Sequence, residues 1–443
     1  MIRHCVLSAL ILASGAASAD MAEHSRRLQV AGIDVITYRT NVKDVVVITG
    51  SLPAGDAMAG ANIAIPTLTG MMLDRGTKAL DKFAIAEQLD NVGAEISFGV
   101  GTQALEIRAK CLKKDLGLVV GLIAAELRTP ALQLQEFDKA KQQFIGALQA
   151  SEQNTEARAQ EAFNRTIFPA GHPNRAHTVR EYEAAAKAAT LNEVKAFHEK
   201  NYGPAHMILV LAGDVDEAEA QSQIDAAFGK WSGGRDFERP AQPAAPTGAR
   251  EISVPLADKP SVSVRLGQAT GLRYKDPDAL ALRVGTAVFG RGFTGRLMGT
   301  VRDKEGLTYN IGAGVGEDTI VDGEWNITAS FAPALLDRGL ASTRRELEKW
   351  WKEGITDQEL AARKQGMIGS YRVGLSTTGG LAGNILVTLQ RGYEIGWLDK
   401  YPDAVNALTR DEVNAAIKTH LDPSVMVLVK AGSVAPAAQA LPK

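Results

Sequence analysis

An internal repeat is the feature that most constrains how this chain can fold. Residues 193–215 (EVKAFHEKNYGPAHMILVLAGDV) align without a gap with residues 412–434 (EVNAAIKTHLDPSVMVLVKAGSV), and ten positions are identical. Upstream, residues 136–146 match residues 359–369 at an offset only four residues larger. Similarity at a nearly constant offset indicates one structural unit present twice. We therefore predict two homologous domains rather than the three that a length of 443 residues would suggest.

Each copy alternates between β-branched segments and amphipathic segments, which predicts two α/β domains of about 200 residues each. In the first copy we expect strands at 34–38 and 45–49, helices at 63–72 and 115–127, an interrupted extended stretch at 95–111, and one long helix over 135–167. In the second copy we expect strands near 262–266 and 325–331, and helices at 278–289 and 336–351. Gly379, Gly380 and Gly383 are expected to bend a helical region.

The composition of the chain places its domain boundaries. Residues 239–250 (RPAQPAAPTGAR) carry three prolines, which is typical of an exposed, semi-extended linker. This linker separates an N-terminal domain, 20–238, from a C-terminal domain, 251–436.

The first nineteen residues have the order of features found in a cleaved signal peptide. Arg3 precedes an apolar stretch over 6–13, and the small-residue triplet Ala17-Ser18-Ala19 follows it. The apolar stretch is too short to cross a bilayer, and no later stretch reaches the required length. We therefore expect export to the periplasm without membrane insertion.

Charge and cysteine content exclude two classes of protein. Lys plus Arg total 49 against 51 Asp plus Glu, without the basic surplus that nucleic-acid backbones attract, so no nucleic-acid partner is expected. Cys5 lies in the signal segment, which leaves Cys111 without a disulfide partner. We expect Cys111 to be a buried apolar residue at the end of a strand rather than a nucleophile.

The repeat, the length and several motifs resemble the pitrilysin/insulinase-type zinc metallopeptidases, and the resemblance covers essentially all of the chain after the signal segment. It implies that each domain is a mostly antiparallel sheet packed with helices. In that family HxxEH supplies two zinc ligands four residues apart and a general base, and a distant glutamate completes the site. Aligned on Gly76-Thr77, the two histidine positions hold Thr67 and Met71, the base position holds Gly70, and the distal glutamate position falls at Ala147.

None of these four residues can perform the family's metal chemistry, because they offer no imidazole or carboxylate. Neither HxxEH nor HExxH occurs elsewhere in the sequence. His172 and His177 lie in the turn-like FPAGHPNRAH, where we expect a solvated loop. The resemblance therefore implies no cofactor in this chain, with zinc bound by a partner subunit.

The string RLMGTVRDKEGLTY in the second domain resembles the family's Arg/Tyr pair, which follows a turn containing Gly290, Gly292 and Gly295. The resemblance implies that Arg302 binds substrate and that Tyr309 donates to the oxyanion of the tetrahedral intermediate, both acting at the partner's zinc site. Considered alone, Arg302 would be a solvated charge and Tyr309 an ordinary strand aromatic. The full string, found in the domain opposite the erased metal motif, favours the functional interpretation.

Three functions follow as hypotheses. The preferred one is the zinc-less partner subunit of a heterodimeric zinc metalloendopeptidase, active only with an HxxEH-containing homologous subunit and acting on peptides. The second is a non-catalytic peptide-binding or scaffold protein of the same fold. An independent hydrolase has no support, because no GxSxG elbow is present. Residues 95–102 correspond to the family's edge strand, which burial against a partner could protect.

Overall fold

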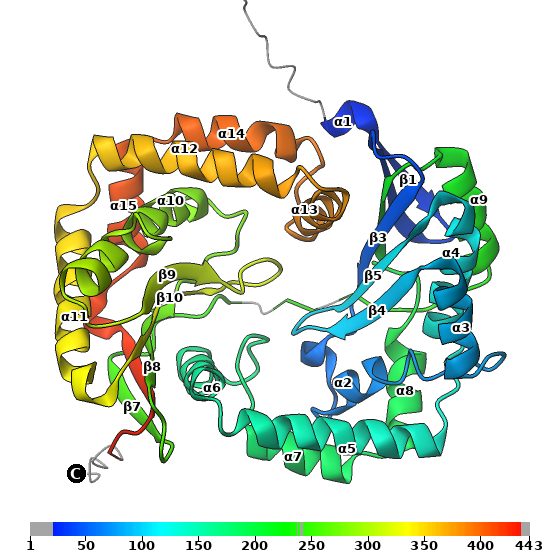
Figure 1. Cartoon of the computed structure of the whole chain (residues 1–443), viewed down its shortest axis with the longest axis horizontal. Coiled ribbons are helices and arrows are strands. Elements are labelled where there is room, and N and C mark those ends of the chain that lie inside the picture. Colours follow the sequence, from blue (N-terminus) through cyan, green and yellow to red (C-terminus); the bar gives the residue numbers. More distant parts are fainter. Residues whose placement is uncertain (1–20, 237, 240–241, 436–443) are drawn as a thin grey trace, which may run out of the picture.

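Two β-sheets face each other across the middle of the molecule, with helices on their outer sides and along both flanks (Figure 1). The computed structural model describes residues 21–236, 238–239 and 242–435. The predicted signal segment lies outside these residues. Among the helices that the structure describes, none has the length and apolar character needed to cross a bilayer.

The first sheet has six strands in the order β1-β2-β6-β3-β5-β4. They are β1 Ser25–Val30, β2 Ile33–Arg39, β3 Val45–Leu52, β4 Glu95–Val100, β5 Leu105–Leu112 and β6 Ile208–Gly213. All neighbours are antiparallel except the parallel pair β2 and β6. Strand β4 lies at the edge, as the sequence predicted.

The second sheet has five strands in the order β7-β11-β8-β10-β9. They are β7 Arg250–Pro255, β8 Val262–Ala269, β9 Asn310–Gly316, β10 Glu324–Phe331 and β11 Val427–Gly432. Here too one pair, β7 and β11, is parallel and the others are antiparallel. Removing β1 from the first sheet leaves the same order, so the two sheets have one topology and the predicted fold class is confirmed.

The helix and strand that end each half explain why the sequence repeat is clearest at residues 193–215 and 412–434. Helices α8 Leu191–Asn201 and α15 Arg410–His420 begin with the same capping box, in which a threonine and the glutamate three residues later cap each other. Each helix leads to the strand that ends at Gly213 or Gly432, at φ of 135° and 145°. Only glycine fits there, because a Cβ on Gly213 would lie 2.1 Å from the Val45 carbonyl oxygen.

Besides α8 and α15, the described residues form further helices in both halves. The first half contains α1 Met21–His24, α2 Ile65–Gly70, α3 Lys82–Val92, α4 Leu116–Arg128, α5 Leu134–Ser151, α6 Thr155–Ile167, α7 Val179–Ala188 and α9 Glu217–Phe228. The second half contains α10 Ala279–Gly290, α11 Leu336–Glu353, α12 Asp357–Gly374, α13 Thr378–Gln390 and α14 Trp397–Ala407.

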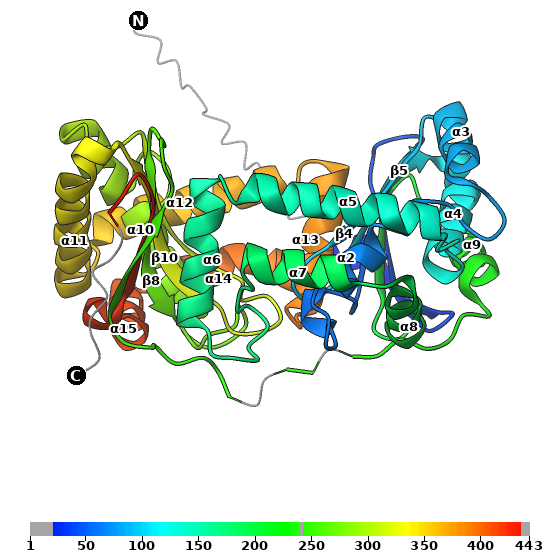
Figure 2. The same ribbon diagram turned by 90° about the horizontal axis from the view of Figure 1, so that it is seen from below.

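Two of these helices are exchanged between the halves. Helix α6 leaves the first half and packs on β8 and β11 of the second sheet, while α13 leaves the second half and packs on β3 and β6 of the first (Figure 1). Figure 2 shows α5 and α7 running along one flank toward α6. Strands β3 and β8 hold the same place in their sheets, and so do β6 and β11. The exchange is therefore reciprocal and follows the symmetry of the repeat.

Apolar burial holds the exchanged helices in place. Phe163 of α6 is fully buried in a cluster with Val429 and Ala431 of the second sheet. Ile385 of α13 is equally buried with Ile36 of the first sheet. Full burial of one such side chain contributes about 1.5–3 kcal/mol, so each contact stabilises the association of the halves substantially.

Hydrogen bonds from His172 and Asn174 to the second half also join the halves, and we call these contacts the histidine clasp. They correct one prediction. His172 is 6% exposed rather than solvated. Its ring stacks on Phe168 at 4.5 Å between centroids, and its Nε2 lies 3.2 Å from an Asp322 carboxylate oxygen in the second half. Asn174 donates to the backbone oxygens of Glu317 and Asp322. Burying the histidine allows the loop to bridge two distant segments, which the local composition could not reveal. His177 is exposed, as expected.

Three other expectations were tested by the fold. The long helix expected over 135–167 is wrong, because it divides into α5 and α6 where Asn154 accepts from the backbone N–H of Ala157 as a helix cap. Gly379, Gly380 and Gly383 form no bend between helices but lie in the first turns of α13. Cys111 is a buried strand residue, and burial raises the pKa of its thiol to about 11, as expected of an unreactive cysteine.

The linker is anchored in the middle. Its described residues are mostly exposed, but Ala244 is buried and its N–H donates to an Asp322 carboxylate oxygen over 2.7 Å. The exposed linker expected from the sequence is therefore correct for most of its length and wrong at Ala244. Asp322 takes part in both the linker contact and the histidine clasp.

Candidate functional site

The first position of the erased metal motif is occupied by a polar cluster. Thr67 on α2 donates from its hydroxyl to an Asp56 carboxylate oxygen over 2.8 Å, and the Tyr182 hydroxyl lies 3.5 Å from the other oxygen. Burial raises the pKa of Asp56 to about 6, and the two hydroxyls oppose that rise only in part. The Thr67 oxygen is thus engaged with a carboxylate instead of being presented to a cation.

The base position is sterically closed. Gly70 is the last residue of α2 and is buried. A Cβ at this position would lie 2.3 Å from Cγ2 of Val100, the last residue of the edge strand β4, and 3.5 Å from Leu105. A glutamate could therefore not be accommodated here unless Val100 moved.

The remaining two positions do not converge on a common centre of ligands. Met71 is half-buried and packs against the core of the first half, while Ala147 on α5 is exposed. Within the described residues, no group of three or more His, Cys, Asp or Glu side chains could hold a metal ion. The residues present do not fit Zn²⁺, because they supply neither its nitrogen nor its carboxylate ligands.

Arg302 and Tyr309 come together in the second half. Arg302 lies on η3, a π-helical segment over Met298–Lys304, and Tyr309 immediately precedes β9. The Arg302 guanidinium carbon lies 4.8 Å from the Tyr309 ring centroid and 5.2 Å from that of Phe293. We call these three residues the Arg302 cluster. Cation–π contacts of this kind stabilise by about 0.5–1 kcal/mol each at exposed sites, so the two rings help to fix the guanidinium.

The cluster faces solvent with unused hydrogen-bonding capacity. Tyr309 is 83% exposed and Phe293 is 72% exposed, which is unusual for large aromatic side chains. In the part of the chain that the structure describes, the Arg302 side chain has one polar contact, a 3.9 Å ion pair with Asp303. The Tyr309 hydroxyl has no hydrogen-bond partner among the same residues. The arrangement can bind a backbone carbonyl through the guanidinium and donate a hydrogen bond through the phenol.

The glycine-containing turn sets the position of this cluster. A Cβ on Gly290 would lie 2.3 Å from the Ala313 backbone nitrogen, so glycine lets the end of α10 approach β9 closely. Arg363 on α12 donates to the Arg291 carbonyl and the Thr294 hydroxyl, which ties the turn down. Phe293 is the functional candidate that the sequence prediction missed. The available signal was an aromatic residue placed between turn glycines, where no core burial is possible.

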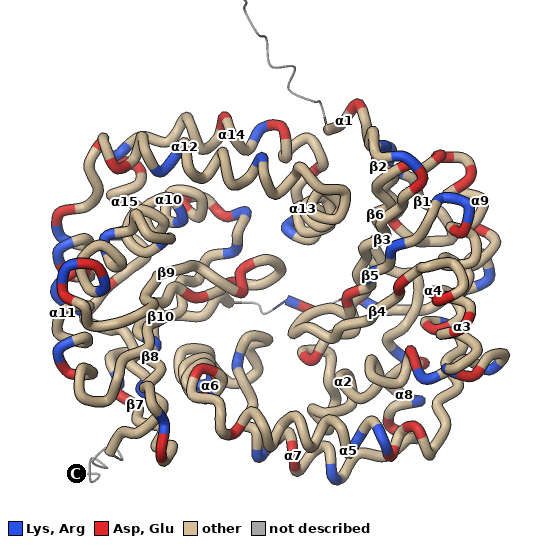
Figure 3. Tube along the Cα trace, in the orientation of Figure 1, with Lys and Arg blue, Asp and Glu red and all other residues tan. Residues whose placement is uncertain are grey.

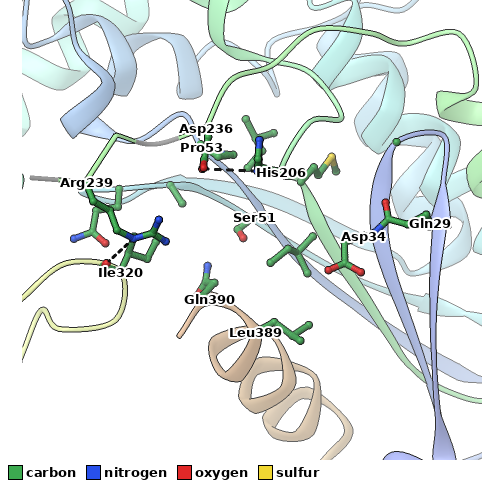
Figure 4. A pocket seen from close by; sticks show the side chains of 16 residues that line it. Gln29, Asp34, Ser51, Pro53, His206, Asp236, Arg239, Ile320, Leu389 and Gln390 are labelled. Atoms are coloured by element: carbon green, nitrogen blue, oxygen red, sulfur yellow. Dashed lines mark hydrogen bonds and ion pairs between the residues drawn. The ribbon is translucent and has the colours of Figure 1, made fainter. Parts of the chain in front are cut away.

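A polar pocket lies at the junction of the halves, and Figure 4 shows its lining. The Arg239 side chain donates to the Ile320 carbonyl over 3.2 Å, and His206 lies 3.8 Å from Asp236. Ser51 on β3 and Gln390 on α13 face the same space (Figure 4). The lining combines Asp34 and Asp236 with Arg239 and His206, so it offers groups of both signs rather than a one-signed site. Basic and acidic residues are likewise interspersed along the described trace (Figure 3).

Comparison with known proteins identifies relatives that match most of the chain. Residues 188–367 match the model of the peptidase M16 inactive domain. A protein named uncharacterized zinc protease from Streptomyces coelicolor is 25% identical over 84% of this chain and 83% of its own length. The non-peptidase homolog YmxG of Helicobacter pylori is 20% identical over 83% of this chain and 84% of its own length.

Solved structures agree on the fold. The crystal structure of a peptidase M16 inactive domain from Pseudomonas fluorescens superposes with a TM-score of 0.85 at 22% identity, covering 93% of this chain and 98% of that chain. The predicted resemblance to the pitrilysin/insulinase-type proteins is therefore confirmed.

Proposed function

We propose that this chain, whose residues 188–367 match the peptidase M16 inactive domain, is the zinc-less subunit of a heterodimeric zinc metalloendopeptidase. A homologous subunit containing HxxEH would supply the metal, the base and the distal glutamate. This chain would supply Arg302 and Tyr309 and enclose the peptide substrate. The predicted signal segment supports placing the complex in the periplasm.

One observation carries the proposal, namely the exposed Arg302 cluster on a chain whose own base position is closed. The Arg302 guanidinium lies between two exposed rings, and the Tyr309 hydroxyl has no hydrogen-bond partner within the described part of the chain. Leaving these aromatic surfaces in water serves no structural purpose that the fold shows. Binding a peptide carbonyl and donating to an oxyanion would use both free groups.

Mixing this chain with a co-expressed homologue that contains HxxEH tests the proposal. Hydrolysis of an unfolded peptide should require both chains. Arg302→Ala should raise KM, and Tyr309→Phe should lower kcat by about tenfold to a thousandfold, the range for loss of one oxyanion donor. Arg338→Ala, an exposed arginine on the outer helix α11, is the matched control and should leave the rate unchanged.

Full activity from the HxxEH chain alone would refute the proposal, as would undiminished activity with both cluster variants. In either case the alternative function, a non-catalytic peptide-binding or scaffold protein, would be favoured. The name of the YmxG relative, a non-peptidase homolog, is compatible with both functions.

A further inference from the structure

A second cavity, lined entirely by the second half, carries an uncompensated positive charge. It has a volume of about 430 Å³ and is lined by residues of α10, β9 and α12, by Asn384 in the middle of α13 and Arg391 just after it, and by Tyr401 of α14. Its lining includes Arg283, Arg291 and Arg391 but no aspartate or glutamate. We call it the arginine pocket.

Among the residues that the structure describes, only one of the three guanidinium groups has a carboxylate partner. Arg283 forms an ion pair with Asp318, which lies behind the pocket wall. Arg391 follows α13 directly and stacks on the Tyr274 ring with its guanidinium carbon 3.4 Å from the ring centroid. The Arg391 side chain has no hydrogen bond or ion pair with any residue that the structure describes, and its Nε is buried without a partner. Burial lowers the pKa of Arg391, because the charged form loses hydration.

Neutral donors complete the lining. Ser370 and Tyr401 contribute hydroxyl groups to the wall, and Asn384 contributes an amide whose nitrogen also donates to the Gly380 carbonyl over 2.7 Å. Tyr371 uses its hydroxyl elsewhere, since it donates to the Leu398 carbonyl over 2.7 Å. A planar guanidinium held flat against an aromatic ring presents its N–H edge in a fixed direction, and that fork matches the two oxygens of a carboxylate.

The arginine pocket lies along β9 from the Arg302 cluster. Tyr309 precedes β9, and Ala313, Gly314 and Val315 near its other end line the pocket. At about 3.3 Å per residue, the six steps from Tyr309 to Val315 cover about 20 Å. An extended peptide parallel to this edge strand would span the same distance with about six residues.

We infer that the arginine pocket binds a carboxylate of a peptide, about six residues away from the peptide group that contacts Arg302. The inference rests on the proposed function, since it assigns a second anchor to the same substrate. Arg391 is the central residue, and Tyr274 positions it. The carboxylate can belong to the peptide's C-terminus or to an acidic side chain.

Peptide binding to the purified chain alone tests this inference without the partner. Three fluorescein-labelled peptides of equal length are compared, with a free C-terminal carboxylate, with a C-terminal amide, and with an amide plus one internal glutamate. A carboxylate should strengthen binding by about tenfold to a hundredfold, the range for hydrogen bonds to a charged group. Preference for the first peptide identifies the terminus, and preference for the third identifies a side chain.

Arg391→Gln should abolish the preference, while Arg338→Gln on the outer helix should retain it. Arg391→Lys keeps the charge without the fork and should retain part of it. Equal affinities of the three peptides for the unmodified chain would overturn the inference whether or not any variant folds. Inorganic phosphate that displaced the acid and amide peptides equally would also overturn it.

The outcomes separate this inference from the proposed function. A carboxylate preference without activation of the HxxEH homologue would sink only the proposed function. Activation that depends on Arg302, without any carboxylate preference, would sink only the arginine pocket as an anchor.

Discussion

Replacing Gly70 by alanine tests whether the former base position is filled by Val100. The added Cβ would lie 2.3 Å from Val100 Cγ2. Because carbon atoms pack at about 3.5–4.0 Å, relieving the overlap requires a movement of about 1.2 Å or more. Val100 is β-branched and belongs to a strand, so it cannot simply rotate away.

The expected cost follows from two opposing effects. Overpacking of this kind destabilises by about 1–3 kcal/mol. Alanine in place of glycine in a helix restores about 0.5–1 kcal/mol. The Gly70→Ala variant should therefore unfold with a free energy up to about 2.5 kcal/mol below that of the unmodified chain.

A double-mutant cycle isolates the contact. Val100→Ala removes the colliding methyl groups, so Gly70→Ala should cost nothing further in that background. The coupling between the two substitutions should be about 1–2 kcal/mol, measured from urea unfolding followed by circular dichroism. Gly146→Ala on α5 is the matched control, because its added Cβ meets nothing within 4 Å and should be neutral or stabilising.

Additive effects of the two substitutions would refute the steric argument, and so would a Gly70→Ala variant as stable as Gly146→Ala. If the coupling is found, reinstating the HxxEH residues alone could not restore a metal site. The strand that occupies the space would have to move as well.

Three further predictions concern buried carboxylates. Burial raises the pKa of Asp56 from 3.8 to about 6, so the free energy of unfolding should fall as pH rises between these two values. The Asp56→Asn variant cannot ionise there, so its stability relative to the unmodified chain should be about 1–3 kcal/mol higher at pH 7 than at pH 4, measured from urea midpoints. Burial, and then the charge of Asp74, raises the pKa of Glu126 from 4.5 to about 8. The unmodified chain should therefore lose about 1.4 kcal/mol of stability per pH unit between pH 5 and 7, and Glu126→Gln should remove this loss. An unchanged dependence of stability on pH in the variant would contradict this. Burial opposes ionisation of Asp322, but hydrogen bonds from His172 and the linker leave its pKa below the usual value, so its contribution to stability should be lost under acid conditions. His172→Ala should cost about 1.5–3 kcal/mol at pH 7 and less at low pH, and equal unfolding midpoints for this variant and the unmodified chain at pH 7 would contradict the role of the clasp.

Local patterns were sufficient to predict most of the fold. The strands at β2, β3, β8 and β10 and the helices α4, α10 and α11 lie within one to three residues of their expected positions. Periodicity and turn residues act over a few residues, so they are readable in a single sequence. The repeat then predicted that the two sheets would have the same topology.

Contacts between residues far apart in the sequence could not be predicted from such local patterns. The exchange of α6 and α13 depends on pairs such as Phe163 with Val429, which lie far apart in the sequence and share no local signal. The same is true of His172, whose burial depends on Asp322. Of the candidate site, the resemblance supplied Arg302 and Tyr309, but not Phe293 or Arg391. Their roles come from aromatic stacking and from an unpaired charge, which only three-dimensional packing reveals.

The reciprocal placement of α6 and α13 means that the peptide linker is not what holds this molecule together. A protease that cut within the linker would leave two fragments still held together by the exchanged helices. They should elute as one particle in size-exclusion chromatography until denatured. Conversely, either half expressed by itself would expose the apolar sheet face that the other half's helix covers, and its own helix α6 or α13 would have no sheet to pack on. Such a half should be recovered mainly as insoluble material. Evolution could therefore separate or rejoin the two coding halves of such a gene without redesigning their contact.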